Sequence, residues 1–269
     1  MITQIVTINL GRQFGGPLLQ KRIKAMFKRY ALFENMLTQT HLLVAGCTGS
    51  GKSVVVNGLI YTALFYKPVE KQFILIDPKR VELNEYRDLP HTIAYASEPE
   101  TIYNALQLAM DICENRYKAM QKTGLKLYSG SDVYLIIDEY ADLVTTDKKR
   151  VKPLIQRLAQ IGRAARIHIV LCTQTPIRSI LDTDIKCNID ARIGLKTRSK
   201  QDSINILGFT GLESLPRYGQ GIYLTPTENT LYYIPYIDDA ARARMINEWK
   251  QAAARVKPHR RGILSRIFK

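Results

Sequence analysis

The chain has 269 residues, 46% hydrophobic and 23% charged, and these ordinary globular values exclude global disorder. Its 39 lysines and arginines outnumber its 24 aspartates and glutamates, which gives a formal charge of +15. This excess indicates a polyanionic partner, usually nucleic acid and less often an anionic membrane surface, although a basic, well-solvated surface would give the same count. The length suits one large domain with short appendages and leaves no room for several independent modules.

The four cysteines, Cys47, Cys113, Cys172 and Cys187, lie far apart and form no C-x-x-C pair. This spacing argues against a zinc site or a secreted disulfide framework and predicts reduced thiols. Residues 1–10 lack the basic and apolar regions of a signal peptide, and no apolar run approaches the roughly 20 residues of a membrane span. We therefore expect a cytoplasmic protein that can lie peripherally at a membrane through a partner.

Short apolar runs alternate with longer segments of helical spacing along most of the chain. The runs are interpreted as buried strands at residues 41–45, 73–76, 133–137, 167–172 and 191–195. The expected helices are residues 52–66, 99–123 and 149–165. Residues 222–224 and 231–234 predict a late β-hairpin whose loop contains Pro226. Because strands alternate with helices, we predict an α/β fold with a mainly parallel central sheet flanked by helices.

Basic segments flank this pattern. We divide the chain into a lead-in at residues 1–38, a single domain at residues 39–236 and a basic tail at residues 237–269. Residues 11–30 of the lead-in contain no acidic side chain. The tail is expected to be helical to about Val256, and Pro258 ends that helix.

The first strand runs directly into a segment that fits the phosphate-loop pattern G-x-x-x-x-G-K-[ST]. Glycines let the backbone curl so that successive N–H groups point at phosphate oxygens, and the following helix adds its N-terminal N–H groups. Lys52 can reach the β- and γ-phosphates, and the Ser53 hydroxyl can bind Mg²⁺. A glycine-rich turn that contains Lys-Ser by chance is the alternative. The predicted ATP-binding residues are Thr48, Gly49, Ser50, Gly51, Lys52 and Ser53.

Two further strand ends carry candidate catalytic groups. Asp138, at the end of an apolar strand, can hold Mg²⁺ directly or through water. The adjacent Glu139 can polarise the attacking water as a general base, a pattern that favours an ATPase over a GTPase. Gln174, at the end of the next strand, is the candidate sensor of the γ-phosphate. The plainer alternatives are an acidic N-cap for the pair and a turn-capping role for the glutamine.

Six stretches carry a resemblance to a known family. They are HLLVAGCTGSGKSVVVNGLI (41–60), FILIDPKRVELNEYRDLPH (73–91), YLIIDEYADL (134–143), RLAQIGRAARIHIVLCTQTP (157–176), NIDARIGLKTRSKQDSINIL (188–207) and GLESLPRYGQGIYL (211–224). Over residues 39–224 the chain resembles the motor domain of the FtsK/SpoIIIE DNA translocases, within the HerA–FtsK group of P-loop ATPases. The Asp77-Pro78-Lys79 element is more particular to that family than a phosphate loop alone.

The resemblance implies a RecA-like core of the additional-strand class that assembles as a hexameric ring and moves double-stranded DNA through its centre using ATP and Mg²⁺. It assigns the phosphate-loop, metal, base and sensor roles to the residues named above. Arg163 matches the family's arginine finger, which acts in a neighbouring subunit. Without the family it is a cation near a helix C-terminus.

Thr173 and Lys200 match positions that face the DNA channel in that family. Thr175 and Ile204 stand where arginines are usual, so Lys196 and Arg198 are expected to supply compensating charge. A solvated basic loop is the alternative for the three cations.

Three functions stay open. The first is a DNA translocase, which without a long linker or winged-helix module suggests a mobile-element version from a plasmid, integrative element or phage. Such a motor would borrow membrane anchoring or DNA specificity from a partner protein. The second is a protein-export motor, because type VII secretion ATPases use related domains. The third is a nucleotide-binding DNA scaffold without turnover, against which the intact Lys52, Asp138 and Glu139 argue.

Overall fold

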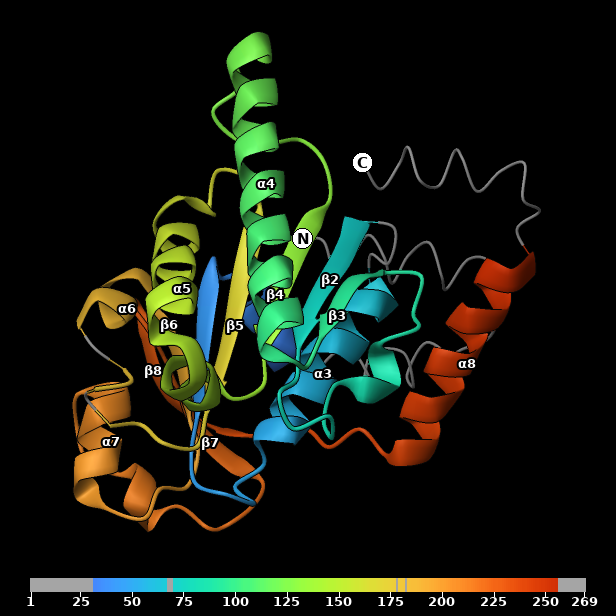
Figure 1. The fold of residues 1–269 in the computed structure, drawn as a ribbon. Coiled ribbons are helices and arrows are strands. Elements are labelled where there is room, and N and C mark those ends of the chain that lie inside the picture. Colours follow the sequence, from blue (N-terminus) through green and yellow to red (C-terminus); the bar gives the residue numbers. More distant parts are fainter. Residues whose placement is uncertain (1–30, 67–69, 178, 182, 256–269) are drawn as a thin grey trace.

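The computed structural model describes residues 31–66, 70–177, 179–181 and 183–255, which are built around one eight-stranded sheet (Figure 1). Its strand order is β3-β2-β4-β5-β1-β6-β7-β8. The strands are β1 (His41–Ala45), β2 (Lys71–Ile76), β3 (Thr92–Ala96), β4 (Asp132–Ile137), β5 (Ile167–Thr173), β6 (Ala191–Gly194), β7 (Gln220–Thr225) and β8 (Glu228–Tyr233). Strands β1 to β6 pair in parallel, and the antiparallel hairpin β7–β8 extends one edge. The predicted α/β fold is confirmed.

Helices cover both faces of the sheet (Figure 1). The helices are α3 (Lys52–Tyr66), α4 (Pro99–Thr123), α5 (Tyr140–Ile161), α6 (Thr183–Asn188), α7 (Lys200–Leu207) and α8 (Asp239–Arg255), with short 3₁₀ turns η2 (Asn84–Tyr86) and η3 (Leu212–Ser214). Helices α4 and α5 pack with one apolar cluster, and α3, α8 and the helical residues 31–38 pack with the other.

The central strands are buried on both faces, which explains their continuous apolar sequences. In β2, Ile74 and Ile76 point into the cluster of α4 and α5, whereas Phe73 and Leu75 point into the cluster of α3. All four side chains are at most 1% exposed. The sheet is therefore a rigid support whose carboxyl-terminal edge can hold a site in place.

The predicted boundaries of β1, α3 and α4 agree with the structure, but other elements differ. Strand β3 and helices α6 and α7 were not predicted. Helix α5 begins at Tyr140, nine residues before the expected start, because it continues across a kink at Asp147. The hairpin turn is only Pro226 and Thr227.

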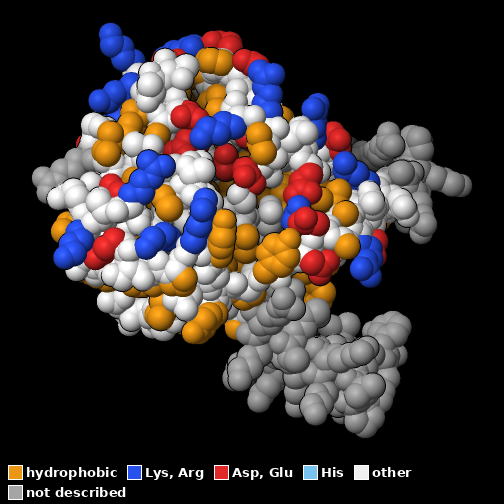
Figure 2. Space-filling view, turned by 90° about the horizontal axis from the view of Figure 1, so that it is seen from below, with side chains coloured by type: hydrophobic (Ala, Val, Ile, Leu, Met, Phe, Trp, Pro, Cys, Tyr) orange, Lys and Arg blue, Asp and Glu red, His pale blue; other side chains and the backbone are white. Residues whose placement is uncertain are grey.

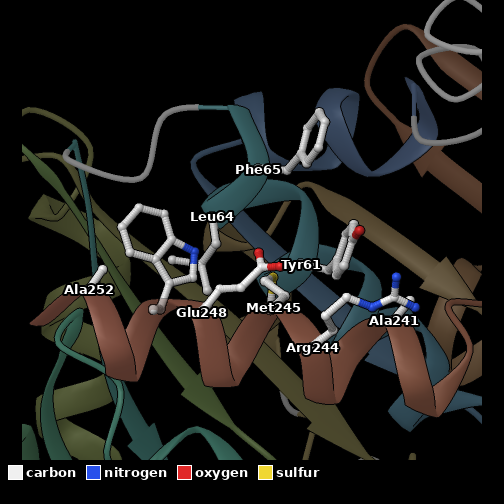
Figure 3. Close-up of a pocket in the computed structure, with 9 residues that line it drawn as sticks. Tyr61, Leu64, Phe65, Ala241, Arg244, Met245, Glu248 and Ala252 are labelled. Carbon is white, nitrogen blue, oxygen red and sulfur yellow. The ribbon is translucent and has the colours of Figure 1, made fainter. Parts of the chain in front are cut away.

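The C-terminal helix α8 lies across α3 and leaves a groove of about 560 Å³ between them (Figure 3). Tyr61 and Leu64 of α3 face Met245 of α8 across this groove, which Trp249 of α8 also lines. Arg242 of α8 donates to Glu85 at 2.6 Å and so ties the helix to η2. The predicted helical tail is thus present as far as Arg255, and Pro258 and most of the basic lead-in lie outside the described residues.

The last part of the lead-in belongs to the core rather than to a separate segment. Leu32, Phe33 and Met36 are buried in the α3 cluster. Gly58 of α3 leaves room for the ring of Phe33, because a Cβ at Gly58 would lie 2.2 Å from Phe33 Cζ. The four cysteines are free. Among the described residues, no helix is both long and apolar enough to cross a bilayer.

Candidate functional site

The candidate site lies at the carboxyl-terminal edge of the parallel strands, where four strand ends meet. Ala45 of β1 is in register with Thr173 of β5, and Ile76 of β2 is in register with Ile137 of β4. The phosphate loop, Gln174, Asp77 and Asp138 follow these strands directly. Figure 2 shows the molecule from this side, where acidic and basic side chains interleave. Open α/β sheets bind ligands at this edge.

The phosphate loop has the conformation that its glycines permit. Gly49 and Gly51 adopt φ angles of +71° and +102°, which disfavour any residue with a Cβ. Gly46 lies so close to the rest of the loop that a Cβ there would stand 2.6 Å from Ser50 Oγ. Helix α3 begins at Lys52, so its unpaired N–H groups open onto the loop. These features fit an oligophosphate.

Lys52 is folded back onto the loop. Its Nζ donates to the carbonyl oxygens of Gly46 at 2.9 Å and Cys47 at 3.1 Å. Burial lowers the pKa of this amine, an effect that the nearby Cys172, Glu139 and other acidic groups oppose. The carbonyl oxygens of Gly46 and Cys47 carry only partial negative charges, whereas a phosphate group would give the Lys52 ammonium group a full negative partner.

Glu139 is buried, with 2% exposure, and is held by β5. Its Oε1 accepts from Thr173 Oγ1 at 2.8 Å, and its carboxylate accepts from the backbone N–H of Gln174 at 3.0 and 3.1 Å. Lys79 Nζ lies 3.7 Å from Glu139 and 3.5 Å from Asp142. The predicted general base is therefore a carboxylate with fixed orientation at the edge of the site.

Asp138 lies among other carboxylates. Burial, together with the negative charges of Asp77, Glu82 and Glu139, raises the pKa of Asp138 to about 7, although the positive charge of Lys79 opposes this rise. Asp77 is fully buried, with Oδ2 accepting from Leu83 N–H at 3.0 Å and Oδ1 without a partner in the described part of the chain. This excess of negative charge suits a divalent cation.

Mg²⁺ fits the site as a cation bound with its phosphate rather than by a protein cage. Among the described residues, no group of three or more histidine, cysteine, aspartate or glutamate side chains is arranged to hold a metal. Mg²⁺ ordinarily keeps waters and uses one or two protein oxygens together with substrate phosphates. Ser53 and Asp138 are the two oxygens that the sequence predicted, and Mg²⁺ would neutralise phosphate charge there.

Gln174 joins the phosphate loop to Glu139, the predicted general base. Thr48 Oγ1 donates to Gln174 Oε1 at 2.6 Å, while the backbone of Gln174 donates to Glu139. Strand β5 lies between β1 and β4, which is the position expected of a sensor strand in the additional-strand class. The structure therefore brings Thr48, Lys52, Asp138, Glu139 and Gln174 together.

Arg163 lies at the opposite end of the parallel strands, before the amino-terminal end of β5. It is exposed in the turn between α5 and β5, whereas Gln174 follows the far end of the same strand. The seven residues of β5 separate the two edges by roughly 23 Å at 3.3 Å per residue. Arg116 holds the turn in place, since its Nη1 donates to the carbonyls of Ala165 at 2.7 Å and Arg166 at 3.2 Å. Arg163 is thus remote from the phosphate loop of its own chain.

The structure does not bring the four predicted DNA contacts to one surface. Thr173 is fully buried in this structure, and its hydroxyl donates to the carboxylate of Glu139. Lys196 Nζ donates to the carbonyl of Glu213 at 2.5 Å. Arg198 and Lys200 are exposed, and Arg198 lines a hollow of about 260 Å³ together with residues of the phosphate loop.

Sequence reasoning missed the roles of Asp77 and Lys79 in this site. The Asp77-Pro78-Lys79 element stood out only as a family signature, and its position after an apolar strand was the one physical signal. The charges of Asp77 and Lys79 act on Asp138, and Lys79 lies beside Glu139, because the pairing of β2 with β4 brings together residues about 60 positions apart.

The sequence pattern of the FtsK/SpoIIIE family matches residues 7–133 and 129–177, more than half of the chain. The chain belongs to the FtsK/SpoIIIE family. This FtsK/SpoIIIE-family chain is 33% identical to the DNA translocase FtsK of Rickettsia prowazekii, in a match that covers 82% of this chain and 36% of that protein. It therefore spans about a third of the length of the curated relatives.

Solved structures share the fold of this FtsK/SpoIIIE-family chain. The pCW3 conjugation coupling protein TcpA, in its monomer form with ATPγS, superposes with a TM-score of 0.70 at 22% identity over 79% of this chain and 66% of that one. The cytoplasmic domain of the type VII secretion ATPase EccC from Thermomonospora curvata gives 0.66 at 21% identity over 78% and 28%. The core is the P-loop ATPase fold.

Proposed function

We propose that this protein hydrolyses ATP and uses the energy to move double-stranded DNA through a ring of identical subunits, as the resemblance to the DNA translocases implies. The single observation that carries the proposal is the placement of the predicted catalytic residues at two opposite ends of the parallel strands. Lys52, Asp138, Glu139 and Gln174 converge at one edge, and Arg163 lies at the other. A complete site then needs a second subunit.

In this proposal each group acts through the geometry described above. Lys52 exchanges the carbonyls of Gly46 and Cys47 for the β- and γ-phosphates of ATP. Glu139, fixed by Thr173 and Gln174, orients the attacking water and accepts its proton. Arg163 of a neighbouring subunit stabilises the charge that develops on the transferred phosphoryl group.

In this proposal the protein binds DNA through its phosphates rather than through its bases. Arg198 lines the hollow that Thr48 and Gln174 also line, and the exposed Lys200 follows two residues later. Loss of the γ-phosphate would shift Thr48 and Gln174, which are hydrogen-bonded to each other, and these residues would in turn shift Arg198 and Lys200. Contacts between cations and phosphates give affinity without sequence readout, which suits a translocase. We further propose that the ring is a hexamer, that the protein acts in the transfer or maintenance of a mobile element, and that a partner protein supplies membrane anchoring or DNA specificity.

The test is phosphate release with and without linear duplex DNA at low salt, together with displacement of a third strand from triplex DNA. We expect DNA to stimulate release, and Lys52→Ala and Arg163→Ala each to lower it by at least about a thousandfold. Arg244→Ala, an equal loss of charge on α8, should have no effect. Mixing the two inactive variants should restore part of the rate, because a Lys52→Ala subunit still donates Arg163 to its neighbour.

Three results would overturn parts of this proposal. A protein that neither binds DNA nor gains ATPase rate from it at low salt is not a DNA translocase. Salt-insensitive binding of a peptide, in place of DNA binding that weakens steeply with salt, would indicate an export motor. Nucleotide binding without any phosphate release would indicate the scaffold.

A further inference from the structure

A loop late in the chain brings an arginine to the phosphate loop. Residues 215–219 connect η3 to β7, and Arg217 lies in their middle. The Nη2, Nε and Cζ atoms of Arg217 lie 3.2, 3.5 and 3.8 Å from the position that a Cβ would occupy on Gly49. The guanidinium therefore covers the phosphate loop of its own chain at a glycine with φ of +71°.

The charge of Arg217 is free for a ligand. The side chain is exposed, and its ring contact is Tyr218, whose centroid lies 5.5 Å from the guanidinium carbon. Within the part of the chain that the structure describes, Arg217 forms no ion pair, whereas Arg166 pairs with Asp132 and Arg242 with Glu85. An unpaired cation beside a phosphate loop is placed to meet an anion.

The loop is anchored at both ends, so Arg217 is held close to Gly49 by the fold. Leu215 donates its backbone N–H to Leu212 at 3.2 Å, and Ile234 of the segment after β8 donates to the carbonyl of Gly219 at 2.9 Å. Leu212 is itself fully buried and accepts from Thr197 N–H at 3.3 Å. The loop is thereby bonded to the segment that leads from β6 into α7.

We propose that Arg217 binds phosphate oxygens of the nucleoside triphosphate held by its own chain. This inference rests on the proposed function only in taking a nucleotide as the ligand. A guanidinium offers planar, paired N–H donors that match two phosphate oxygens at once, which lysine cannot do. Arg217 would act within one subunit, in contrast to Arg163, which lies at the other edge of the sheet.

The experiment measures binding of a fluorescent ATP analogue to the full chain without DNA. Arg217→Ala should weaken the affinity at least about tenfold, the usual effect of losing a hydrogen bond to a charged group. Arg217→Lys should recover only part of it, because the paired donors are lost. Arg244→Ala is the matched control, because it removes the same charge from an exposed site on α8.

Unchanged affinity in Arg217→Ala, or an equal loss in Arg217→Ala and Arg244→Ala, would overturn the inference. Arg217→Gln keeps a polar side chain but removes the charge and shortens it, and it must also lose affinity while its melting temperature without nucleotide stays that of the wild type. A wild-type protein that binds no nucleotide would instead overturn the proposed function, so the two failures are distinguishable.

Discussion

Gly58→Ala is expected to destabilise the protein although alanine is the better helix former. The added Cβ would lie 2.2, 2.3 and 2.6 Å from three ring carbons of Phe33, where carbon atoms ordinarily stand about 3.5–4.0 Å apart. Phe33 is fully buried, so its ring has no free space to enter. Overpacking costs about 1–3 kcal/mol, and alanine in a helix contributes about 1 kcal/mol in return. Because the required shift exceeds about 1 Å, we expect a net loss of about 1–2 kcal/mol.

Thermal and urea unfolding of four proteins would test this: wild type, Gly58→Ala, Phe33→Leu and the double variant. The melting temperature of Gly58→Ala should fall by about 2–6 °C for a chain of this length. Phe33→Leu should cost less in the Gly58→Ala background than alone, with a coupling of at least about 1 kcal/mol. A melting temperature that rises instead would show that helix propensity alone acts and that Phe33 does not rest on Gly58.

Two further changes have expected outcomes. Thr173→Val removes the hydroxyl that donates to Glu139 at 2.8 Å, so the kcat of ATP hydrolysis should fall about tenfold while KM stays nearly unchanged. Thr173→Ser keeps the hydroxyl and should keep most of the rate. An unchanged kcat in Thr173→Val would show that this hydroxyl takes no part in hydrolysis. Burial lowers the pKa of His91 to about 4 in the folded protein. Below about pH 6.5 the histidine therefore binds a proton in the unfolded chain but stays neutral in the folded one. The free energy of unfolding should consequently fall by about 3 kcal/mol between pH 6.5 and 4. His91→Phe keeps the aromatic contact with Trp249 but cannot bind a proton, so its free energy of unfolding should fall less over that pH range. If the free energy of unfolding fell as steeply with pH in the variant as in the wild type, His91 would not be the group responsible.

The parts of the fold that sequence reasoning predicts well are those with strong local signals. Strand β1 and helix α4 have unbroken apolar patterns and clear ends, Gly124 among them. Helix α7 was missed because residues 200–207 are mostly polar, and Ser199 starts the helix by accepting from Asp202 N–H at 3.1 Å. The start of α5 was missed because the polar run around Asp147 interrupts the apolar period.

The candidate site shows the same division. Lys52 and Asp138 follow from local motifs, since a phosphate loop and an acidic strand end each carry their own signature. The partners of Glu139 do not, because Thr173 lies 34 residues away in the chain and Lys79 lies 60. Their positions depend on the order β2-β4-β5, which arises from packing both faces of the sheet.

Arg163 lies before β5 and the phosphate loop lies beyond the opposite end of that strand, so in the proposed function each subunit has a donor end and an acceptor end. A contact that joins a donor end to an acceptor end is heterologous, so repeating it either closes a ring or continues as an open filament. Every subunit in such an assembly has the same orientation, and the two faces of a ring differ. DNA without any sequence asymmetry would therefore still experience a direction, set by the face at which it enters.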